Sequence, residues 1–432
     1  KPIDDSYDIK AKYVPKLVEN MNNNINEEIK QICNINNNDT CLPNEGHIIV
    51  YGHQRKAIQN MLDYDFICQK ERPSVIAIIN PYGSSNVTSE IFFWNNKEIF
   101  IPSYNNVKEA FTNHSQVNIV LNFASHRSVY SSTISMYELK DTLAKDLSFV
   151  CVIAEGVAEL ETRRLIAYSK QYNIILLGPS TTGAIFVNQF RLGNIGGSIN
   201  NILKSRLNTK QGNIAYISRS GGLSNELNYI ISQYSSGLKY GICIGGDRNP
   251  ASTYKDYLLH FENDTAVQII ILLGEHGSTL EYEIIDLLKD KRITKPIIAY
   301  CSGSCADNYT NGMEFGHAGS FASSKRETAA YKNIQLEQAG CIVPKSFQDI
   351  PVILNQLYST LVENDIIEYN PYESKISFPM NDVDALSCNM IRKKTTFTCS
   401  ISNEIGNELM YNNETISNII NDDNKGIGYV IS

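Results

Sequence analysis

Residues 214–226 read Ile214-Ala215-Tyr216-Ile217-Ser218-Arg219-Ser220-Gly221-Gly222-Leu223-Ser224-Asn225-Glu226. The first part is a short apolar run without polar alternation, which is typical of a parallel strand covered on both faces. It passes into small and hydroxylated residues, and a stretch of helical period follows at 225–233. A strand, a tight turn and a helix in this order predict one unit of a doubly wound α/β sheet.

The same rhythm extends over most of the chain, in two series. The apolar runs are residues 47–52, 74–80, 117–124, 149–156 and 174–178, and then residues 214–218, 240–246, 267–275, 296–302 and 340–345. Stretches of helical period fall between them at 54–69, 158–171, 225–233, 281–291 and 325–338. Two doubly wound α/β domains are therefore predicted, with ligands bound beyond the carboxyl ends of the strands.

The length and charge of the chain limit the classes of function. Its 432 residues are too many for one ordinary core, so two or three domains are expected. The formal net charge of -8 argues against a nucleic-acid surface and against binding to an anionic membrane. Because we find neither an apolar run of bilayer length nor a secretory leader, a soluble, cytoplasmic protein is expected.

The 10 cysteines are scattered, and several lie inside apolar runs, so they are predicted to be reduced and buried. Cys301 and Cys305 are not followed by further ligands at zinc spacing, and no metal site is predicted. Residues 1–45 are mostly polar and rich in asparagine, which indicates a linker or tail.

Two of the predicted strand-end loops have the composition of anion sites. Val50-Tyr51-Gly52-His53-Gln54-Arg55 places a glycine where a phosphate could approach a helix start, although a plain tight turn explains this partial pattern equally well. The turn from Ser218 to Gly222 combines small residues with hydroxyl groups ahead of a helix. This second turn favours anion binding over a purely structural role.

Two further loops contribute a carboxylate and a histidine. Glu275 ends an apolar run and either caps the next helix or orients a catalytic partner. His317 stands between Gly316 and Ala318-Gly319, so its imidazole is expected to be accessible and nucleophilic near neutral pH. Two helix starts and an accessible imidazole together predict a phosphohistidine. The sequence contains no GxSxG elbow and no Walker A motif as a competing site.

Five short motifs occur in the order found in one known family. They are SRSGG at Ser218, IGGDR at Ile244, LGE at Leu273, TKPI at Thr294 and FGHAG at Phe315. From about residue 47 to about residue 364 the chain thus resembles the CoA ligases that comprise succinyl-CoA synthetase α subunits and ATP-citrate lyases. The stretch 91–99, the triplet Ser224-Asn225-Glu226 and the continuation at 391–397 and 426–428 resemble the citrate enzymes more closely.

The resemblance implies a mechanism for His317. ATP phosphorylates the imidazole, and the phosphoryl group passes to a carboxylate of citrate. CoA then displaces phosphate to give citryl-CoA, which a separate citrate-synthase-like domain cleaves to acetyl-CoA and oxaloacetate. The ATP-grasp portion that binds ATP and Mg²⁺ is not among these residues. ATP-grasp and citryl-CoA lyase domains are therefore expected in cis or as another subunit, and the full-length protein is expected to form a homo-oligomer.

The resemblance also implies a role for each motif residue. Glu275 is expected to hydrogen-bond His317, although His276 beside it replaces an apolar residue of the family. The phosphoryl group would be bound by Ser218, Arg219, Ser220, Gly221, Gly222, Gly277, Ser278 and Thr279. CoA would be bound by Gly52, His53, Gln54, Arg55, Asn122, Phe123, Ala124, Ser125, Ile153, Ala154 and Glu155.

The resemblance divides the chain into four parts. Residues 1–45 would be a linker or tail, 46–185 a Rossmann-like CoA-binding domain, 186–365 a flavodoxin-like ligase domain, and 366–432 a linker and the start of the citrate-synthase-like domain. Two alternatives remain open. One is the α subunit of another acyl-CoA synthetase acting on succinate, malate or acetate, and the other is a non-catalytic module that senses CoA or a nucleotide.

Overall fold

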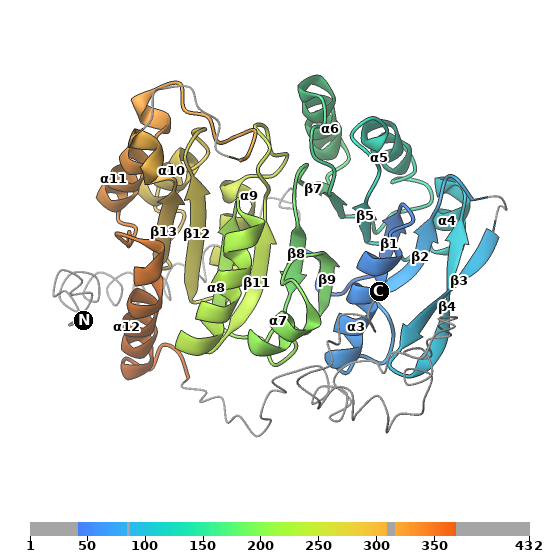
Figure 1. Cartoon of the computed structure of the whole chain (residues 1–432), viewed down its shortest axis with the longest axis horizontal. Helices are drawn as coiled ribbons and strands as arrows, with labels where there is room; N and C mark the ends of the chain where they lie inside the picture. The colour runs from blue at the N-terminus through green and yellow to red at the C-terminus, as the bar shows by residue number, and fades with distance from the viewer. Residues whose placement is uncertain (1–41, 84–86, 309–315, 369–432) are drawn as a thin grey trace, which may run out of the picture.

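The computed structural model describes residues 42–83, 87–308 and 316–368, which form two α/β units side by side (Figure 1). The first unit (blue to teal) contains, in chain order, β1 (Ile48–Tyr51), α3 (Arg55–Ile67), β2 (Val75–Ile79), β3 (Val87–Trp94), β4 (Lys97–Tyr104), α4 (Val107–Asn113), β5 (Ile119–Asn122), α5 (Val129–Tyr137), β6 (Phe149–Val152), α6 (Glu159–Gln171) and β7 (Ile175–Leu177). Its seven strands lie in the order β3-β4-β2-β1-β5-β6-β7. All are parallel except β3, which pairs with β4 in an antiparallel hairpin.

The second unit (green to orange) contains β8 (Gly183–Phe186), β9 (Phe190–Gly193), α7 (Ile199–Lys204), β10 (Ile214–Ser218), α8 (Gly221–Tyr234), β11 (Leu238–Cys243), α9 (Tyr254–Asn263), β12 (Ile269–Glu275), α10 (Tyr282–Lys289), β13 (Ile297–Ser302), α11 (Ala329–Ala339) and α12 (Ile350–Glu363). Its strand order is β13-β12-β10-β11-β8-β9. The four strands from β10 to β13 are parallel, and the β8–β9 hairpin pairs antiparallel with β11.

Both sheets have a switch point, where successive crossovers leave in opposite directions. In the first sheet β1 lies between β2 and β5, and in the second β10 lies between β11 and β12. Ligands of open α/β sheets bind beyond the carboxyl ends of the strands at such points. The residues that end β10 and β12, Ser218 and Glu275, are therefore at a position that favours a ligand site.

The predicted α/β class is confirmed, and the predicted strands occur near their expected positions with one exception. Residues 340–345 form only an isolated bridge, between Ile298 and Ile342. The next residues are Val343 and Pro344, and proline has no N–H with which to extend the pairing. The predicted helix at 225–233 begins earlier, at Gly221, and the one at 325–338 begins later, at Ala329.

The two hairpins were not foreseen, because the strands of the first one do not consist of continuous apolar runs. Most of β3 is exposed or half-buried, as is typical of the edge of a sheet. The change from the first sheet to the second occurs between Leu177 and Gly183, so the predicted division at 185/186 falls inside β8. Nearly all of the predicted segments 1–45 and 366–432 lies outside the described residues.

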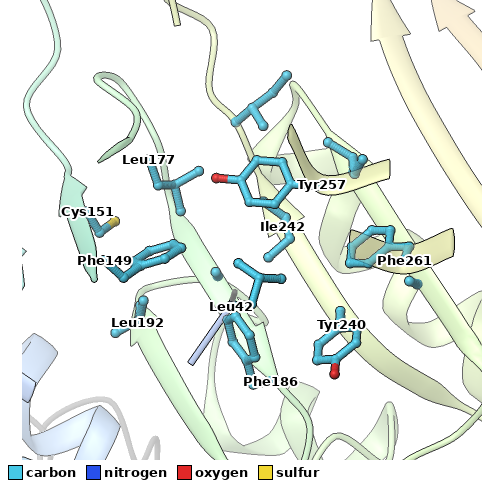
Figure 2. Packing of buried hydrophobic residues seen from close by; sticks show 14 of the residues in the cluster. Leu42, Phe149, Cys151, Leu177, Phe186, Leu192, Tyr240, Ile242, Tyr257 and Phe261 are labelled. Atoms are coloured by element: carbon cyan, nitrogen blue, oxygen red, sulfur yellow. The ribbon is translucent and has the colours of Figure 1, made fainter. Parts of the chain in front are cut away.

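One continuous cluster of buried side chains joins the two units (Figure 2). It includes Phe149 and Leu177 of the first sheet, Leu192 of β9 and Ile242 of β11. The hydroxyl of Tyr64, in α3, also donates a hydrogen bond of 2.8 Å to the carbonyl of Leu207 in the second unit. The two units therefore share a core, which fixes the carboxyl edges of their sheets relative to each other.

None of the helices in the described part of the chain combines the length and apolar character that crossing a bilayer requires.

We expect the core of the second sheet to be sensitive to truncation. Ile271 lies in the middle of β12 and is fully buried. Its replacement by alanine should lower the free energy of unfolding by about 2–5 kcal/mol, because it removes buried methyl groups and leaves a cavity. Urea unfolding followed by circular dichroism measures this loss.

The matched control is Ile334→Ala on α11, where the side chain is 50% exposed. This variant should change the free energy of unfolding by no more than about 0.5 kcal/mol. Equal effects at the two positions would contradict the assignment of β12 to the core.

Candidate active site

The imidazole of His317 is hydrogen-bonded to the carboxylate of Glu275 at the end of β12. The distance from Nδ1 of the ring to Oε2 of Glu275 is 2.7 Å. An ionised carboxylate only accepts hydrogen bonds, so Nδ1 carries the proton and Nε2 of the neutral ring carries the lone pair. The side chain of His317 is 33% exposed, whereas that of Glu275 is 7% exposed. A buried carboxylate thus orients a ring that solvent can reach.

The hydrogen bond to Glu275 raises the pKa of His317 above its usual 6.5. Burial acts in the opposite direction, and the charge of Arg219 also lowers the pKa, while the charges of Glu275 and Glu155 raise it. The net shift is upward. The ring is therefore protonated, and not nucleophilic, up to a higher pH than an ordinary histidine.

Arg219 lies on the other side of the Glu275 carboxylate and is almost completely buried. Its Nε is 3.0 Å from Oε1 of Glu275. Its terminal nitrogens donate to Oγ of Ser278 at 2.9 Å and to the carbonyl of Asp247 at 2.7 Å. Arg219 therefore fixes the Glu275 carboxylate and balances its charge, on the side opposite to His317. All of these contacts direct the guanidinium of Arg219 toward protein atoms, and its role as a phosphate ligand stays a prediction.

The turn from Ser218 to Gly222 leads directly into α8. The Oγ of Ser220 accepts a hydrogen bond of 3.3 Å from the N–H of Leu223 and so caps the helix. The Oγ of Ser218 accepts from the N–H of Ser220 at 3.1 Å. Gly222 is exposed in the first turn. This helix start thus presents a small, exposed residue and the positive end of a helix dipole.

The second predicted helix start differs from the first. The residues from Gly277 to Thr279 precede α10, which begins only at Tyr282. The N–H of Gly277 donates 2.8 Å to the carbonyl of Glu327 and is therefore already paired. Ser278 bonds to Arg219, as described above. The turn packs against the residues that follow His317, since Gly277 lies beside Gly319. Of the three residues of the turn, Ser278 is partly exposed, Thr279 is exposed and Gly277 is buried.

Gly246 forms a wall of the site that the sequence analysis did not assign. A Cβ atom at this position would lie 2.4 Å from Cγ of His317, so the imidazole packs directly on the glycine backbone. The carbonyl of Gly246 also accepts 3.0 Å from the N–H of Gly319. The signal that could have revealed this wall is the pair Gly245-Gly246 immediately after a buried strand.

The first sheet brings the three segments predicted to bind CoA to one edge. Strands β1, β5 and β6 are neighbours, and Tyr51 pairs with Asn122, which pairs with Val152. The residues that follow each strand therefore lie side by side at the switch point. Among the predicted residues, those with exposed side chains are His53, Gln54, Arg55, Ser125 and Glu155.

Several of these side chains are already engaged within the protein. Asn122 is fully buried, and its amide donates to Ser132 at 2.9 Å and to Thr133 at 3.1 Å, while its oxygen accepts from the N–H of Ala124 at 2.9 Å. Asn122 therefore fixes the conformation of the loop that follows β5. Its predicted part in CoA binding stays a prediction and would be an indirect one, through that loop.

His53 and Arg55 both turn toward the β3–β4 hairpin. Nε2 of His53 is 2.8 Å from Oε2 of Glu90, and Nη1 of Arg55 is 3.1 Å from the same oxygen. The guanidinium of Arg55 also lies 4.8 Å from the centre of the Phe92 ring. Because both side chains are more than 40% exposed, they are held at the surface beside the first switch point.

A chain of backbone contacts connects this edge to the histidine. The carbonyl of Ala154 accepts 2.7 Å from the N–H of Ser180, and the carbonyl of Ser180 accepts 3.2 Å from the N–H of Gly246. Gly246 in turn packs on His317. The segment after β6, which is predicted to bind CoA, is thus linked through Ser180 to the glycine on which the imidazole packs.

Within the described ranges, no three His, Cys, Asp or Glu side chains gather so as to hold a metal ion.

Comparison with known proteins relates this region to the CoA ligases. A family model described as CoA-ligase matches residues 217–342, which include the turn after β10, Glu275 and His317. Probable ATP-citrate synthase subunit 1 of Schizosaccharomyces pombe is 42% identical over 383 residues, which cover 89% of this chain and 61% of that protein. ATP-citrate synthase of Homo sapiens is 40% identical over the same share of this chain and 34% of its own length.

A solved structure agrees with these relatives. ATP citrate lyase from Methanothrix soehngenii, in complex with citrate and coenzyme A, aligns with a TM-score of 0.74 and 38% identity, covering 84% of this chain and 57% of that one. The chain therefore spans between about a third and three fifths of the length of these relatives. The match to the CoA-ligase family model covers residues 217–342. Over 383 residues the chain is homologous to the ATP-citrate synthases, also called ATP citrate lyases.

We expect Glu275→Gln to lower the pKa of His317. The substitution removes the negative charge that favours the protonated ring and weakens the hydrogen bond to Nδ1. An NMR titration of the histidine ring signals measures the shift. His260, whose pKa is lowered by burial and which lies on α9, is the internal control and should titrate unchanged. An unchanged pKa of His317 would show that Glu275 does not act on the ring.

Proposed function

We propose that this chain provides the CoA-ligase part of an ATP-citrate lyase, which forms acetyl-CoA and oxaloacetate from citrate, CoA and ATP. The observation that carries the proposal is the hydrogen bond of 2.7 Å between Glu275 and His317 at the switch point of the second sheet. It leaves Nε2 of an accessible imidazole as a nucleophile. The homology to ATP-citrate synthases supports the choice of citrate over other acids.

His317 would first accept a phosphoryl group. The Nε2 lone pair attacks the terminal phosphorus of ATP, the bond to the bridging oxygen breaks, and ADP leaves. The phosphorylated ring retains the proton on Nδ1 and gains positive charge, which the carboxylate of Glu275 stabilises. The start of α8 at Gly221 and Gly222 would stabilise the negative phosphoryl oxygens.

His317 would then return to its neutral state. A carboxylate oxygen of citrate attacks the phosphorus, the bond from Nε2 to phosphorus breaks, and citryl phosphate forms. The thiol of CoA then gives up its proton and its sulfur attacks the activated carbonyl. The bond from that carbonyl carbon to the phosphoryl oxygen breaks, and phosphate leaves with the proton as citryl-CoA forms. CoA would lie along the edge formed by the segments at Gly52, Phe123 and Ala154, because that edge is bonded through Ser180 to the wall of the histidine site.

Further domains are part of the proposal. An ATP-grasp partner would bind ATP with Mg²⁺, and a citryl-CoA lyase domain would cleave citryl-CoA, either in cis or as another subunit. The relative from Methanothrix soehngenii binds citrate and coenzyme A, which fits the proposed substrates. The proposed compartment is a reducing one, such as the cytoplasm, because several cysteines lie inside apolar runs, as expected of reduced and buried thiols.

Labelling with radioactive ATP in the presence of an ATP-grasp partner tests the first step. The wild-type chain should take up phosphate in an acid-labile, base-stable form, as expected of phosphohistidine. His317→Ala should reduce this labelling to background. The control is His47→Ala, because His47 lies immediately before β1, at the opposite end of the first sheet from the site. Labelling that persists in His317→Ala would exclude this histidine as the phosphate carrier.

Substrate preference separates this proposal from another acyl-CoA synthetase. CoA-dependent release of ADP by the reconstituted enzyme should be at least about tenfold faster with citrate than with succinate or malate, since polar groups built for one acid are left unpaired by another. A preference for succinate would indicate a succinyl-CoA synthetase. No ADP release with any acid, despite an intact fold, would favour a non-catalytic module.

A further inference from the structure

A second buried ion pair lies beneath the active site, between Lys332 on α11 and Glu281 just ahead of α10. The distance from Nζ of Lys332 to Oε2 of Glu281 is 2.7 Å, and the two side chains are 1% and 2% exposed. Charges buried this deeply are costly unless every polar atom is satisfied. Neither residue touches the imidazole, and the steps described above use neither of them.

The pair holds the backbone of Glu275 on both sides. Lys332 donates from Nζ to the carbonyl of Glu275 at 2.5 Å and to the carbonyl of Gly277 at 2.7 Å. Oε1 of Glu281 accepts from the N–H of Glu275 at 3.2 Å. One ammonium and one carboxylate therefore fix the peptide groups of the residue that orients His317.

Gly274, the residue before Glu275, provides the space that the Glu281 carboxylate occupies. A Cβ atom there would lie 2.5 Å from Oε1 of Glu281, so any other residue would displace the carboxylate. The side chain of Glu275 is held separately, by the ion pair with Arg219. The backbone and the carboxylate of Glu275 thus have independent supports, and the ion pair of Lys332 and Glu281 supports the backbone.

We propose that Lys332 and Glu281 are positioning residues, which aim the Glu275 carboxylate at Nδ1 of His317 by fixing the turn that carries it. The effect on phosphate transfer rests on the proposed function, but the effect on the imidazole does not. Loss of the ammonium leaves two carbonyls and one carboxylate without their partner in a closed core. The turn must then rearrange, and the bond between Glu275 and His317 lengthens.

Charged and titratable groups from several elements surround the ion pair and the imidazole. Tyr254 of α9 and Cys301 of β13 interact electrostatically with Glu281, and Cys301 also with Lys332. Arg219, from the turn after β10, and Glu155, from the loop after β6, act on His317 itself. Removal of the positive charge of Lys332, acting through space alone, would raise the pKa of His317. Loss of the aimed hydrogen bond would lower it. The direction in which the pKa of His317 shifts therefore distinguishes a positioning role of Lys332 from a purely electrostatic effect of its charge.

The test is an NMR titration of the His317 ring in the 432-residue chain carrying Lys332→Met. We expect the pKa of His317 to fall toward its usual 6.5. Lys239→Met is the matched control, because Lys239 forms a comparable ion pair of 2.6 Å with Asp264 in the same unit, near the start of β11. The Lys239 pair is less buried, with side chains 11% and 16% exposed, so that variant should lose less stability and leave the pKa of His317 unchanged.

Lys332→Gln provides a second variant in case the methionine variant does not fold, since an amide keeps donors without the charge. It should give a smaller fall in the same direction. An unchanged or higher pKa of His317 in a folded Lys332 variant would overturn the proposal. The titration needs neither ATP nor a partner, so absence of phosphate labelling in the wild type would count against the proposed function alone.

Discussion

The carboxylate of Glu275 lies between a buried guanidinium and an imidazole, and the chemistry of the site depends on this arrangement. Nε of Arg219 lies 3.0 Å from the carboxylate and balances its charge in a largely buried place. Its second oxygen fixes the orientation and the protonated nitrogen of His317. Without the cation the carboxylate would be costly to bury, and without the carboxylate the ring would be free to turn.

The doubly wound sheet explains why these groups meet. Parallel strands end at one edge, and the switch point between β10 and β12 brings the residues after both strands together. Ser218 at the end of β10 pairs with Leu273 of β12, so the turn that carries Arg219 and the strand end that carries Glu275 are adjacent. The fold thus assembles the site from segments far apart in the sequence.

Much of this was predictable, because continuous apolar runs identify buried parallel strands and the small residues after them identify open turns. The pairing of Glu275 with His317 was expected from the family resemblance, whereas the residues alone left Glu275 as either a helix cap or an orienting group. The packing of Gly246 on His317 and the contacts of Lys332 with the backbone of Glu275 were not foreseen. Both depend on contacts across the sheet, between residues separated by tens of positions, and local sequence patterns carry no information about such contacts. The β3–β4 hairpin was missed because the edge of a sheet needs no continuous apolar run.

The shared core in Figure 2 has a mechanical consequence. A hinge between the two units would have to pull Phe149 and Leu177 away from Leu192 and expose apolar surface, at roughly 25 cal/mol for each Å². The described part of the chain should therefore move as one rigid body. Any large opening that admits a bulky ligand must come from surface loops or from neighbouring domains and chains.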